Sequence, residues 1–399
     1  MSLQTRAPSQ ASVRLGAAPS LLPLMGAVFA AFLVAGLAMP VLPLHVHRGL
    51  GLGPFGVGLI AASQFAAAAV SRLRAGRHAD SRGASHAVTT GLLLNAAGGL
   101  LYLLSPLFLR TPVLSAAILF AGRAVLGAGE SFVITGAQAW GLALAGPSNA
   151  GAVIGWMGTA MYAALALGAP LGTALYGSAG FTGIAAAATA VPFVALAWVV
   201  KLPRVAAAAA ARPPLTRLLR AIWLPGVALS LASAGFGAMT AFLSLLFAAR
   251  GWTVWPAFTA FTLAFIAART LLGRLADRKG GAKIALIFLL WQAAGQAMLW
   301  LAPSAPIGLL GAGLTGFGYS LVYPALGVEA VRRAPREHKG MAMGGYTAFL
   351  DVALAATTPL LGLLAAARGI GVVFLASAVC ALSAVPVTLT LMKRITIWN

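Results

Sequence analysis

The chain has 399 residues, of which 60% are hydrophobic and only 8% are charged, and its mean hydropathy is +0.94. Because soluble domains carry about 25% charged residues, this composition excludes an ordinary soluble protein. A net charge of +21 would indicate nucleic-acid binding in a soluble chain, but the position of the charges described below gives it another meaning.

Apolar segments long enough to cross a bilayer recur along the whole chain. A membrane-spanning helix needs about 20 apolar residues. We expect twelve such helices, at residues 22–47, 54–75, 84–105, 113–142, 150–176, 179–202, 222–248, 256–273, 282–302, 305–330, 340–366 and 370–392. Residues 1–20 lack the apolar core of a signal peptide, so we expect the first span to be retained. The sequence therefore predicts an all-α polytopic membrane protein.

Basic residues are distributed unevenly between the two expected sides of the membrane. With the N-terminus in the cytoplasm, the cytoplasmic segments hold 21 of the 27 Lys and Arg residues. The opposite side holds Arg48, Arg110, Arg250 and Arg368, and the spans hold Arg123 and Arg269. Cytoplasmic loops of membrane proteins carry such an excess. The basic charge therefore reports topology rather than a nucleic-acid partner.

Two motifs occur once in each half of the chain. Residues 71–83 and 268–280 are identical at Arg72/Arg269, Gly76/Gly273, Arg77/Arg274, Ala79/Ala276, Asp80/Asp277 and Gly83/Gly280. Residues 127–133 likewise match 316–322, and the same alignment pairs Gly151 with Gly340, Gly155 with Gly344 and Pro170 with Pro359. Repeats at a large, fixed spacing indicate a duplicated structural unit.

The repeat divides the chain into two six-helix halves. We expect an N-terminal half at 21–202 and a C-terminal half at 222–393, joined by a basic cytoplasmic linker at 203–221. Short cytoplasmic tails at 1–20 and 394–399 complete the organisation.

The doubled Gly-x-x-x-Asp-x-x-Gly motif resembles the signature of the major facilitator superfamily of transporters. Within that superfamily, residues 122–132, 168–172, 232–237 and 323–327 resemble the bacterial YhhS/YfcJ group of exporter-like proteins. The resemblance implies an interdomain latch formed by Gly76, Asp80, Gly83, Gly273, Asp277, Arg278 and Gly280. In such a latch Asp80 would face the helix that starts near Gly340, and Asp277 the helix that starts near Gly151. The alternative is a simple turn-and-cap motif.

Two acidic residues lie well inside the apolar spans, Glu130 and Asp351. Asp351 falls about 16 Å from the cytoplasmic end of its span, near the middle of the bilayer. An ionisable residue there is costly and typical of proton or ion pathways, although a protonated carboxyl bonded to a neighbouring helix is the alternative. Arg123 and Glu130 share one helix face. Arg123 would hold a carboxylate ionised or bind an anionic substrate group, unless it is a paired structural arginine.

The alignment of the two repeats pairs a tyrosine with each of these acidic residues. Glu130 aligns with Tyr319, and Asp351 aligns with Tyr162. A structural scaffold needs no such asymmetry, whereas directional coupling does. We therefore expect these four positions to be specialised for coupling or for substrate.

Residues 168–172 resemble the antiporter motif of the superfamily, through Gly168, Pro170 and Gly172. The family pattern has glycine before the proline, whereas Ala169 stands here. The resemblance implies export by antiport and leaves it unproven.

These features favour a secondary transporter with a site between two halves. We expect proton-coupled efflux of a small organic solute, with proton-coupled uptake of a sugar or organic acid, or a non-transporting receptor, as alternatives. No Walker motif and no His-Glu-x-x-His motif occurs, so we expect neither an ATP-driven pump nor an enzyme, and no catalytic residue, cofactor or metal. The expected partners are the solute, protons and the lipid bilayer, without nucleic acid, for a monomer in the bacterial inner membrane with both termini cytoplasmic.

Overall fold

A computed structural model describes residues 18–146, 150–202, 215–273, 275–334 and 339–396. Those ranges contain helices and no strand. The α-helices are α1 (Ala18–Ala38), α2 (Leu42–Leu44), α3 (Pro54–Arg82), α4 (Ala84–Leu104), α5 (Pro112–Ala145), α6 (Ala150–Val199), α7 (Leu215–Ala249), α8 (Trp255–Leu272), α9 (Leu275–Lys279), α10 (Gly281–Leu301), α11 (Ala305–Arg333), α12 (Lys339–Arg368) and α13 (Gly371–Thr396). Short π- and 3₁₀-helices follow α2 and α4, at His45–Gly49 and Ser105–Phe108.

The predicted spans agree with these helices except in the first span and around α6 and α7. The span predicted at 22–47 is divided among α1, α2 and the π-helix, with a turn at residues 39–41. In the described ranges, 11 helices are long and apolar enough to cross a membrane, whereas the sequence predicts twelve. The predicted spans 150–176 and 179–202 form one helical element, α6, which is interrupted at Gly180 by a non-helical backbone with φ 62° and ψ −161°. Helix α7 begins at Leu215, inside the predicted linker.

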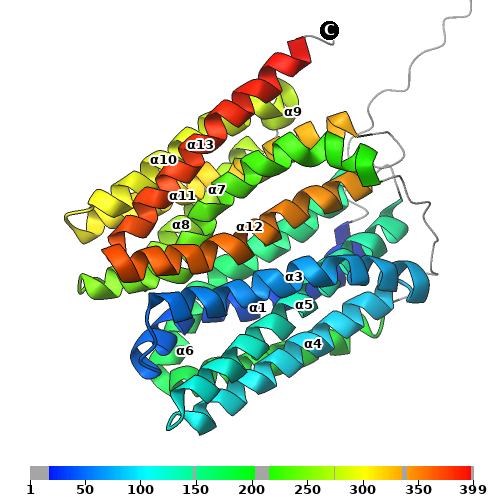
Figure 1. The fold of residues 1–399 in the computed structure, drawn as a ribbon. Coiled ribbons are helices and arrows are strands. Elements are labelled where there is room, and N and C mark those ends of the chain that lie inside the picture. The colour runs from blue at the N-terminus through cyan, green and yellow to red at the C-terminus, as the bar shows by residue number, and fades with distance from the viewer. Residues whose placement is uncertain (1–17, 147–149, 203–214, 274, 335–338, 397–399) are drawn as a thin grey trace, which may run out of the picture.

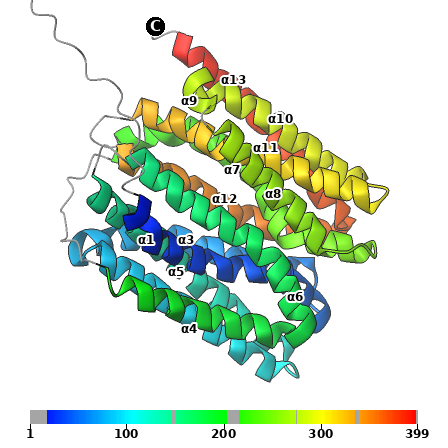
Figure 2. The ribbon, with the colours of Figure 1, turned by 180° about the vertical axis from the view of Figure 1, so that it is seen from behind.

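The helices gather in two groups that lie side by side. Figures 1 and 2 show α1 to α6 on one side of the molecule and α7 to α13 on the other. In the first group α4 packs on α5 and α6, α1 packs on α6, and α3 packs on α5. In the second group α10 packs on α11 and α13, α7 packs on α12 and α13, and α8 packs on α11. The groups meet mainly where α3 contacts α12 and α6 contacts α8.

Glycines bring the helices of each group into backbone contact. A β-carbon at Gly127 of α5 would overlap the carbonyl oxygen of Gln64 in α3. A β-carbon at Gly316 of α11 would overlap the carbonyl oxygen of Phe261 in α8. Small residues allow membrane helices to approach closely. Gly127 and Gly316 are aligned by the sequence repeat, so equivalent residues make equivalent helix crossings.

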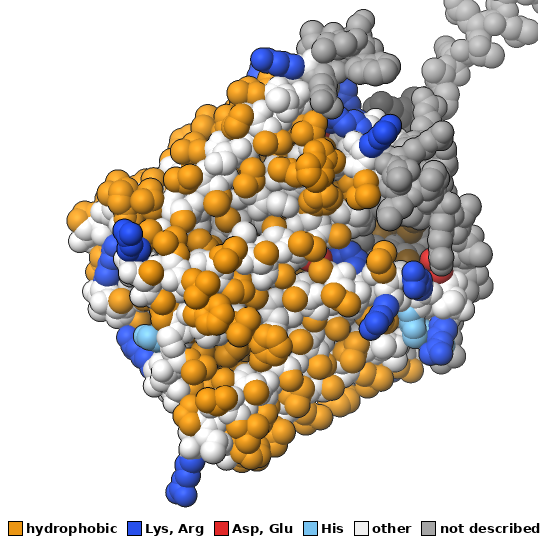
Figure 3. All heavy atoms as spheres, viewed as in Figure 1, with side chains coloured by type: hydrophobic (Ala, Val, Ile, Leu, Met, Phe, Trp, Pro, Cys, Tyr) orange, Lys and Arg blue, Asp and Glu red, His pale blue; other side chains and the backbone are white. Residues whose placement is uncertain are grey.

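The outer surface is apolar between two ends that carry the basic residues. Large exposed side chains such as Leu107, Trp198 and Leu301 are 60% or more accessible. Hydrophobic side chains cover the middle of the face in Figure 3, and Lys and Arg gather toward its ends. This is the surface expected of a bundle whose middle contacts lipid.

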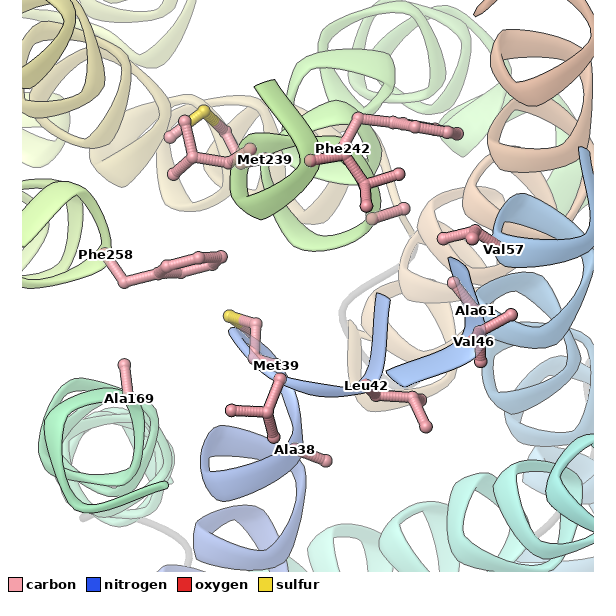
Figure 4. Packing of buried hydrophobic residues seen from close by; sticks show 14 of the residues in the cluster. Ala38, Met39, Leu42, Val46, Val57, Ala61, Ala169, Met239, Phe242 and Phe258 are labelled. Carbon is pink, nitrogen blue, oxygen red and sulfur yellow. The ribbon is translucent and has the colours of Figure 1, made fainter. Parts of the chain in front are cut away.

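An apolar cluster joins the two groups at one end of the bundle. Met39, which follows α1, points across the interface toward Met239 of α7 and Phe258 of α8 (Figure 4). At the same end, β-carbons at Gly58 and Gly362 would lie 2.6 Å and 2.7 Å from backbone oxygens of α12 and α3, respectively. The start of α3 is therefore packed tightly on the end of α12. This end holds the α1–α3 and α7–α8 connections, which the charge distribution assigns to the extracytoplasmic side.

Candidate functional site between the two helix groups

An ion pair crosses between the two helix groups. Arg72 of α3 donates from Nε to Oδ2 of Asp351 in α12 at 2.8 Å, and its Nη2 also donates to that oxygen. The side chains of Arg72 and Asp351 are 20% and 8% exposed. A carboxylate inside a membrane protein is costly unless it is paired. The predicted midplane carboxylate therefore has a cationic partner, on the opposite helix group.

A second arginine crosses the interface at the position related by the repeat. The guanidinium carbon of Arg269 in α8 lies 5.3 Å from the ring centre of Tyr162 in α6. Its Nη1 also donates to the backbone oxygen of Ser320 at 3.2 Å. This geometry is a cation–π contact, worth about 0.5–2 kcal/mol.

The two crossings are equivalent in position and different in chemistry. Arg72 and Arg269 occupy the same place in the repeated motif, and their partners Asp351 and Tyr162 align in the other repeat. One crossing is thus an ion pair that a proton can neutralise, and the other is a contact with a phenol ring. The structure brings together residues that the sequence relates only by alignment.

Glu130 and Arg123 do not form an ion pair in the part of the chain that the structure describes. Instead, Gln64 of α3 donates to both carboxylate oxygens of Glu130, at 2.8 Å and 2.6 Å. Arg123 and Glu130 are 6% and 7% exposed. Arg123 lies close enough to interact electrostatically with Glu130 and with Tyr102. Its Nε and Nη1 atoms have no hydrogen-bond partner among the described residues.

Aromatic side chains from both helix groups surround Tyr319, one of the four positions predicted to serve coupling or substrate. Tyr319 of α11 stacks on Phe236 of α7, with ring centres 5.2 Å apart. Phe265 of α8 lies 4.2 Å from Tyr162 and 6.4 Å from Tyr319, measured between ring centres. We call Tyr162, Phe236, Phe261, Phe265 and Tyr319 the aromatic cluster. Tyr162 and Tyr319 thus share the neighbour Phe265. Glu130 and Asp351, in contrast, have separate partners, Gln64 and Arg72.

The predicted latch lies partly outside the described residues. The two predicted latch contacts involve Asp277, Gly151 and Gly340. The structure does not describe the side chain of Asp277 or the surroundings of the two glycines. Asp80, near the end of α3, and Arg278 of α9 are exposed. The motif also includes Gly76 of α3 and Gly273, which follows α8.

The last glycine of each motif has a clear conformational role. Gly83 has φ 99° and Gly280 has φ 92°. This is a region that L-residues other than glycine enter only at a cost. Both glycines begin a new helix, α4 and α10, directly after the motif. The repeated motif is therefore a repeated turn in structure as well as in sequence.

The glycines of the antiporter-like segment pack α6 against α1. A β-carbon at Gly168 would lie 2.6 Å from the backbone of Gly36, and one at Gly172 would overlap the carbonyl oxygen of Leu37. Pro170 lies between them inside α6. The two glycines therefore explain how α6 approaches α1, whichever way a solute moves.

Three residues of this region were not singled out from the sequence. Arg72 was assigned to the cytoplasmic side, although its alignment with Arg269, which the sequence places inside a span, is a signal that it reaches inward. Gln64 is one of the few amide side chains inside the apolar spans, and such a residue either contacts solute or bonds between helices. Glu329 falls at the end of the predicted span 305–330 and was not counted as well inside it, yet it is 1% exposed. It accepts hydrogen bonds from the amide of Ala282 at 3.1 Å and from Arg333 at 2.6 Å, and its four-residue spacing from Arg333 is a recognisable signal.

Known proteins resemble the chain over most of its length. The family model described as Major Facilitator Superfamily matches residues 24–257 and 248–396. An uncharacterized MFS-type transporter of Salmonella typhimurium is 42% identical over 369 residues, which are 92% of this chain and 95% of that protein. The uncharacterized MFS-type transporter YhhS of Escherichia coli is 38% identical over 367 residues, 92% of this chain and 91% of its own. The structure of the nucleoside transporter NupG is similar with a TM-score of 0.75 at 13% identity, over 93% of this chain and 99% of that one.

Proposed function

The chain belongs to the major facilitator superfamily, a family of membrane transporters and not of enzymes, and we propose that it exports a small organic solute by alternating access in exchange for protons. The observation that carries the coupling is the Arg72–Asp351 ion pair. It joins the two helix groups at α3 and α12 and includes a group that a proton can neutralise.

We propose twelve membrane spans in two halves of six. A helix of 47 residues, the length of the α6 span, would extend about 70 Å, more than twice the thickness of the bilayer core. The break at Gly180 divides it into two spans of ordinary length. The matching helix pairs of the two groups support a repeat related to the sequence duplication. The basic bias supports a multi-pass inner-membrane protein with cytoplasmic termini.

Neutralisation of Asp351 is the proposed coupling step. With Asp351 ionised, its attraction to Arg72 holds α3 against α12. When Asp351 takes up a proton, the ion pair is lost and Arg72 is free to turn toward water at its end of α3. The Arg269–Tyr162 contact has no such dependence, because a cation–π contact requires no charge on the phenol. One interface would therefore respond to protons while the other stays closed, which gives the cycle a direction.

A distance measurement between α3 and α12 tests this step without knowledge of the solute. Arg74 is exposed and Gly344 has open space where a side chain would start, so spin labels on cysteines at these positions, in a Cys380→Ser background, report the separation of the two helices. We expect the distance to increase on acidification. Asp351→Asn should give the acidic distance at neutral pH and remove the pH response.

Arg110→Gln is the control for that measurement, since Arg110 is exposed at the opposite end of the molecule. It should keep the full pH response. A distance that changes with pH equally in the parent protein and in Asp351→Asn would refute a coupling role for Asp351.

The direction of transport is tested in proteoliposomes once a solute is identified. An antiporter accumulates solute inside vesicles whose interior is acidic, because outward proton flow drives inward solute flow. A proton symporter, the alternative proposal, accumulates solute when the interior is alkaline. If the Asp351→Asn variant no longer accumulates solute under the condition that drives the parent protein, the coupling is assigned to Asp351.

A further inference from the structure

Arg123 is a buried cation whose donors are not all used by the protein. The residue is 6% exposed, and its Nε and Nη1 find no hydrogen-bond partner within the described ranges. The neighbouring carboxylate of Glu130 is bonded through both oxygens to Gln64. Buried charged donors without an acceptor are costly and rare in folded proteins. The guanidinium is therefore suited to an acceptor that arrives from outside.

Arg123 lines a small void of about 10 Å³ between the two helix groups. The cavity walls are largely apolar, formed by residues such as Met39, Leu42, Val57 and Ile60, and Thr240 of α7 contributes a hydroxyl. That hydroxyl donates to the Gly237 oxygen at 3.1 Å, so it keeps its capacity to accept. No carboxylate lines the cavity among the described residues.

A second cavity continues on the other side of Met39. It also has about 10 Å³ of space and is lined by Tyr162, Phe236, Phe261 and Phe265 of the aromatic cluster, together with Leu165 and Thr262. Met39 lines both cavities, and Figure 4 shows its side chain extended between the two helix groups. Methionine is flexible and adapts to its neighbours. A rotation of Met39 would join the two voids, and separation of the helix groups during alternating access would widen them into a solute site.

We infer that the solute is an amphipathic organic anion. Its carboxylate-like group binds the free donors of Arg123 by charge-assisted hydrogen bonds, and its aromatic or apolar body extends past Met39 to the aromatic cluster. This inference rests on the proposed transport function and names its substrate class. An organic cation would meet the guanidinium of Arg123, and no acid lines either cavity among the described residues. A polyol would leave most of its hydroxyls unpaired, since Thr240, Thr262 and Tyr162 supply the neutral hydroxyl groups that line the cavities among the described residues.

Three isosteric probes with different charges test the substrate class. Phenylacetate, phenylacetamide and phenethylammonium share one body and carry a negative, zero and positive charge, and acetate carries the charge without the body. Ligands that bind only the folded state raise the thermal unfolding temperature. We expect purified protein in detergent to be stabilised by phenylacetate and by none of the other three at equal concentration.

Substitutions then assign the two ends of the ligand. Arg123→Gln should weaken phenylacetate binding about tenfold or more, Arg123→Lys should retain part of it, and Arg110→Gln should leave it unchanged. Phe236→Ala should weaken it severalfold by removing one wall of the aromatic cluster. If Arg123→Gln does not fold, the charge series on the unaltered protein and the Phe236→Ala variant still decide the question.

The inference is overturned if phenylacetamide or phenethylammonium stabilises the protein as well as phenylacetate does, or if Arg110→Gln loses as much binding as Arg123→Gln. It also falls if all four probes are without effect. The proposed transport function has a separate test, because the pH-dependent distance between α3 and α12 needs no ligand. Absence of phenylacetate binding with an intact pH response would reject the substrate class alone, whereas an absent pH response would reject the coupling mechanism.

Discussion

Arg72→Gln should destabilise the protein by about 3 kcal/mol, because it leaves the Asp351 carboxylate buried without its cation. Asp351→Asn should also destabilise it, by leaving the guanidinium of Arg72 unpaired. The two variants should differ in their response to pH. A carboxylate can be neutralised by taking up a proton, whereas an arginine in a protein keeps its charge. The stability of Arg72→Gln should therefore rise on acidification, and that of Asp351→Asn should not. Unfolding of the purified protein in a denaturing-detergent titration at two pH values measures both effects.

The double variant is the decisive control for the ion pair. Arg72→Gln with Asp351→Asn removes both charges and leaves two amides that can bond to each other, so it should recover most of the lost stability. The coupling energy of the resulting double-mutant cycle reports the pair itself. If the two single effects simply add, or if Arg72→Gln has the same pH dependence as the parent, the ion pair contributes little to the closed interface.

Gly316→Ala should destabilise the C-terminal group by about 1–3 kcal/mol through overpacking. The new methyl group would overlap the carbonyl oxygen of Phe261. That oxygen belongs to the backbone of α8 and cannot rotate away, so α8 and α11 must separate. Thermal unfolding of the purified variant measures the loss. Gly127→Ala, at the equivalent crossing of α3 and α5, should have a similar effect. It should also disturb the bond from Gln64 to Glu130, since the overlap is with the Gln64 backbone.

Gly313→Ala is a matched control on the same helix. A β-carbon at Gly313 would lie 3.8 Å from its nearest neighbour, the carbonyl oxygen of Ala260, which is an ordinary contact. Alanine has a better helix propensity than glycine by up to about 1 kcal/mol, so this substitution should be neutral or stabilising. Equal losses for Gly313→Ala and Gly316→Ala would show that the effect arises from the helix itself and not from the crossing with α8.

In the proposed mechanism, the asymmetry between the two crossings gives the transport cycle a direction. A duplicated chain begins with two equivalent interfaces, α3 with α12 and α6 with α8. Retaining the same arginine at both, while placing a carboxylate at one and a phenol at the other, would make one interface sensitive to protons. In the structure, Arg72 and Arg269 both reach their partners on the opposite helix group.

Much of the fold could be predicted from the sequence, because bilayer thickness and the positive-inside rule act directly on local composition. Span positions follow from that pattern, and the family follows from the doubled Gly-x-x-x-Asp-x-x-Gly motif. The sequence predicts separate spans at 150–176 and 179–202, whereas in the structure α6 continues on both sides of Gly180. The break between the two segments depends on the backbone of that single residue. Of the candidate site, Asp351, Arg123 and Glu130 stand out because ionisable residues are rare in apolar segments.

Hydropathy and family motifs, which are properties of the chain alone, are sufficient to show that this protein is a polytopic membrane transporter. The partners of its ionisable residues become visible only in the folded molecule. Asp351 pairs with Arg72 and not with Arg123, and Glu130 is held by Gln64. The folded molecule also shows that Arg123 faces a cavity with free donors. The physical reason is that a partner is chosen by which helix faces meet across an interface. Which faces meet depends on the close helix contacts at glycines and on how the two helix groups pack together. Neither can be read from a short stretch of sequence.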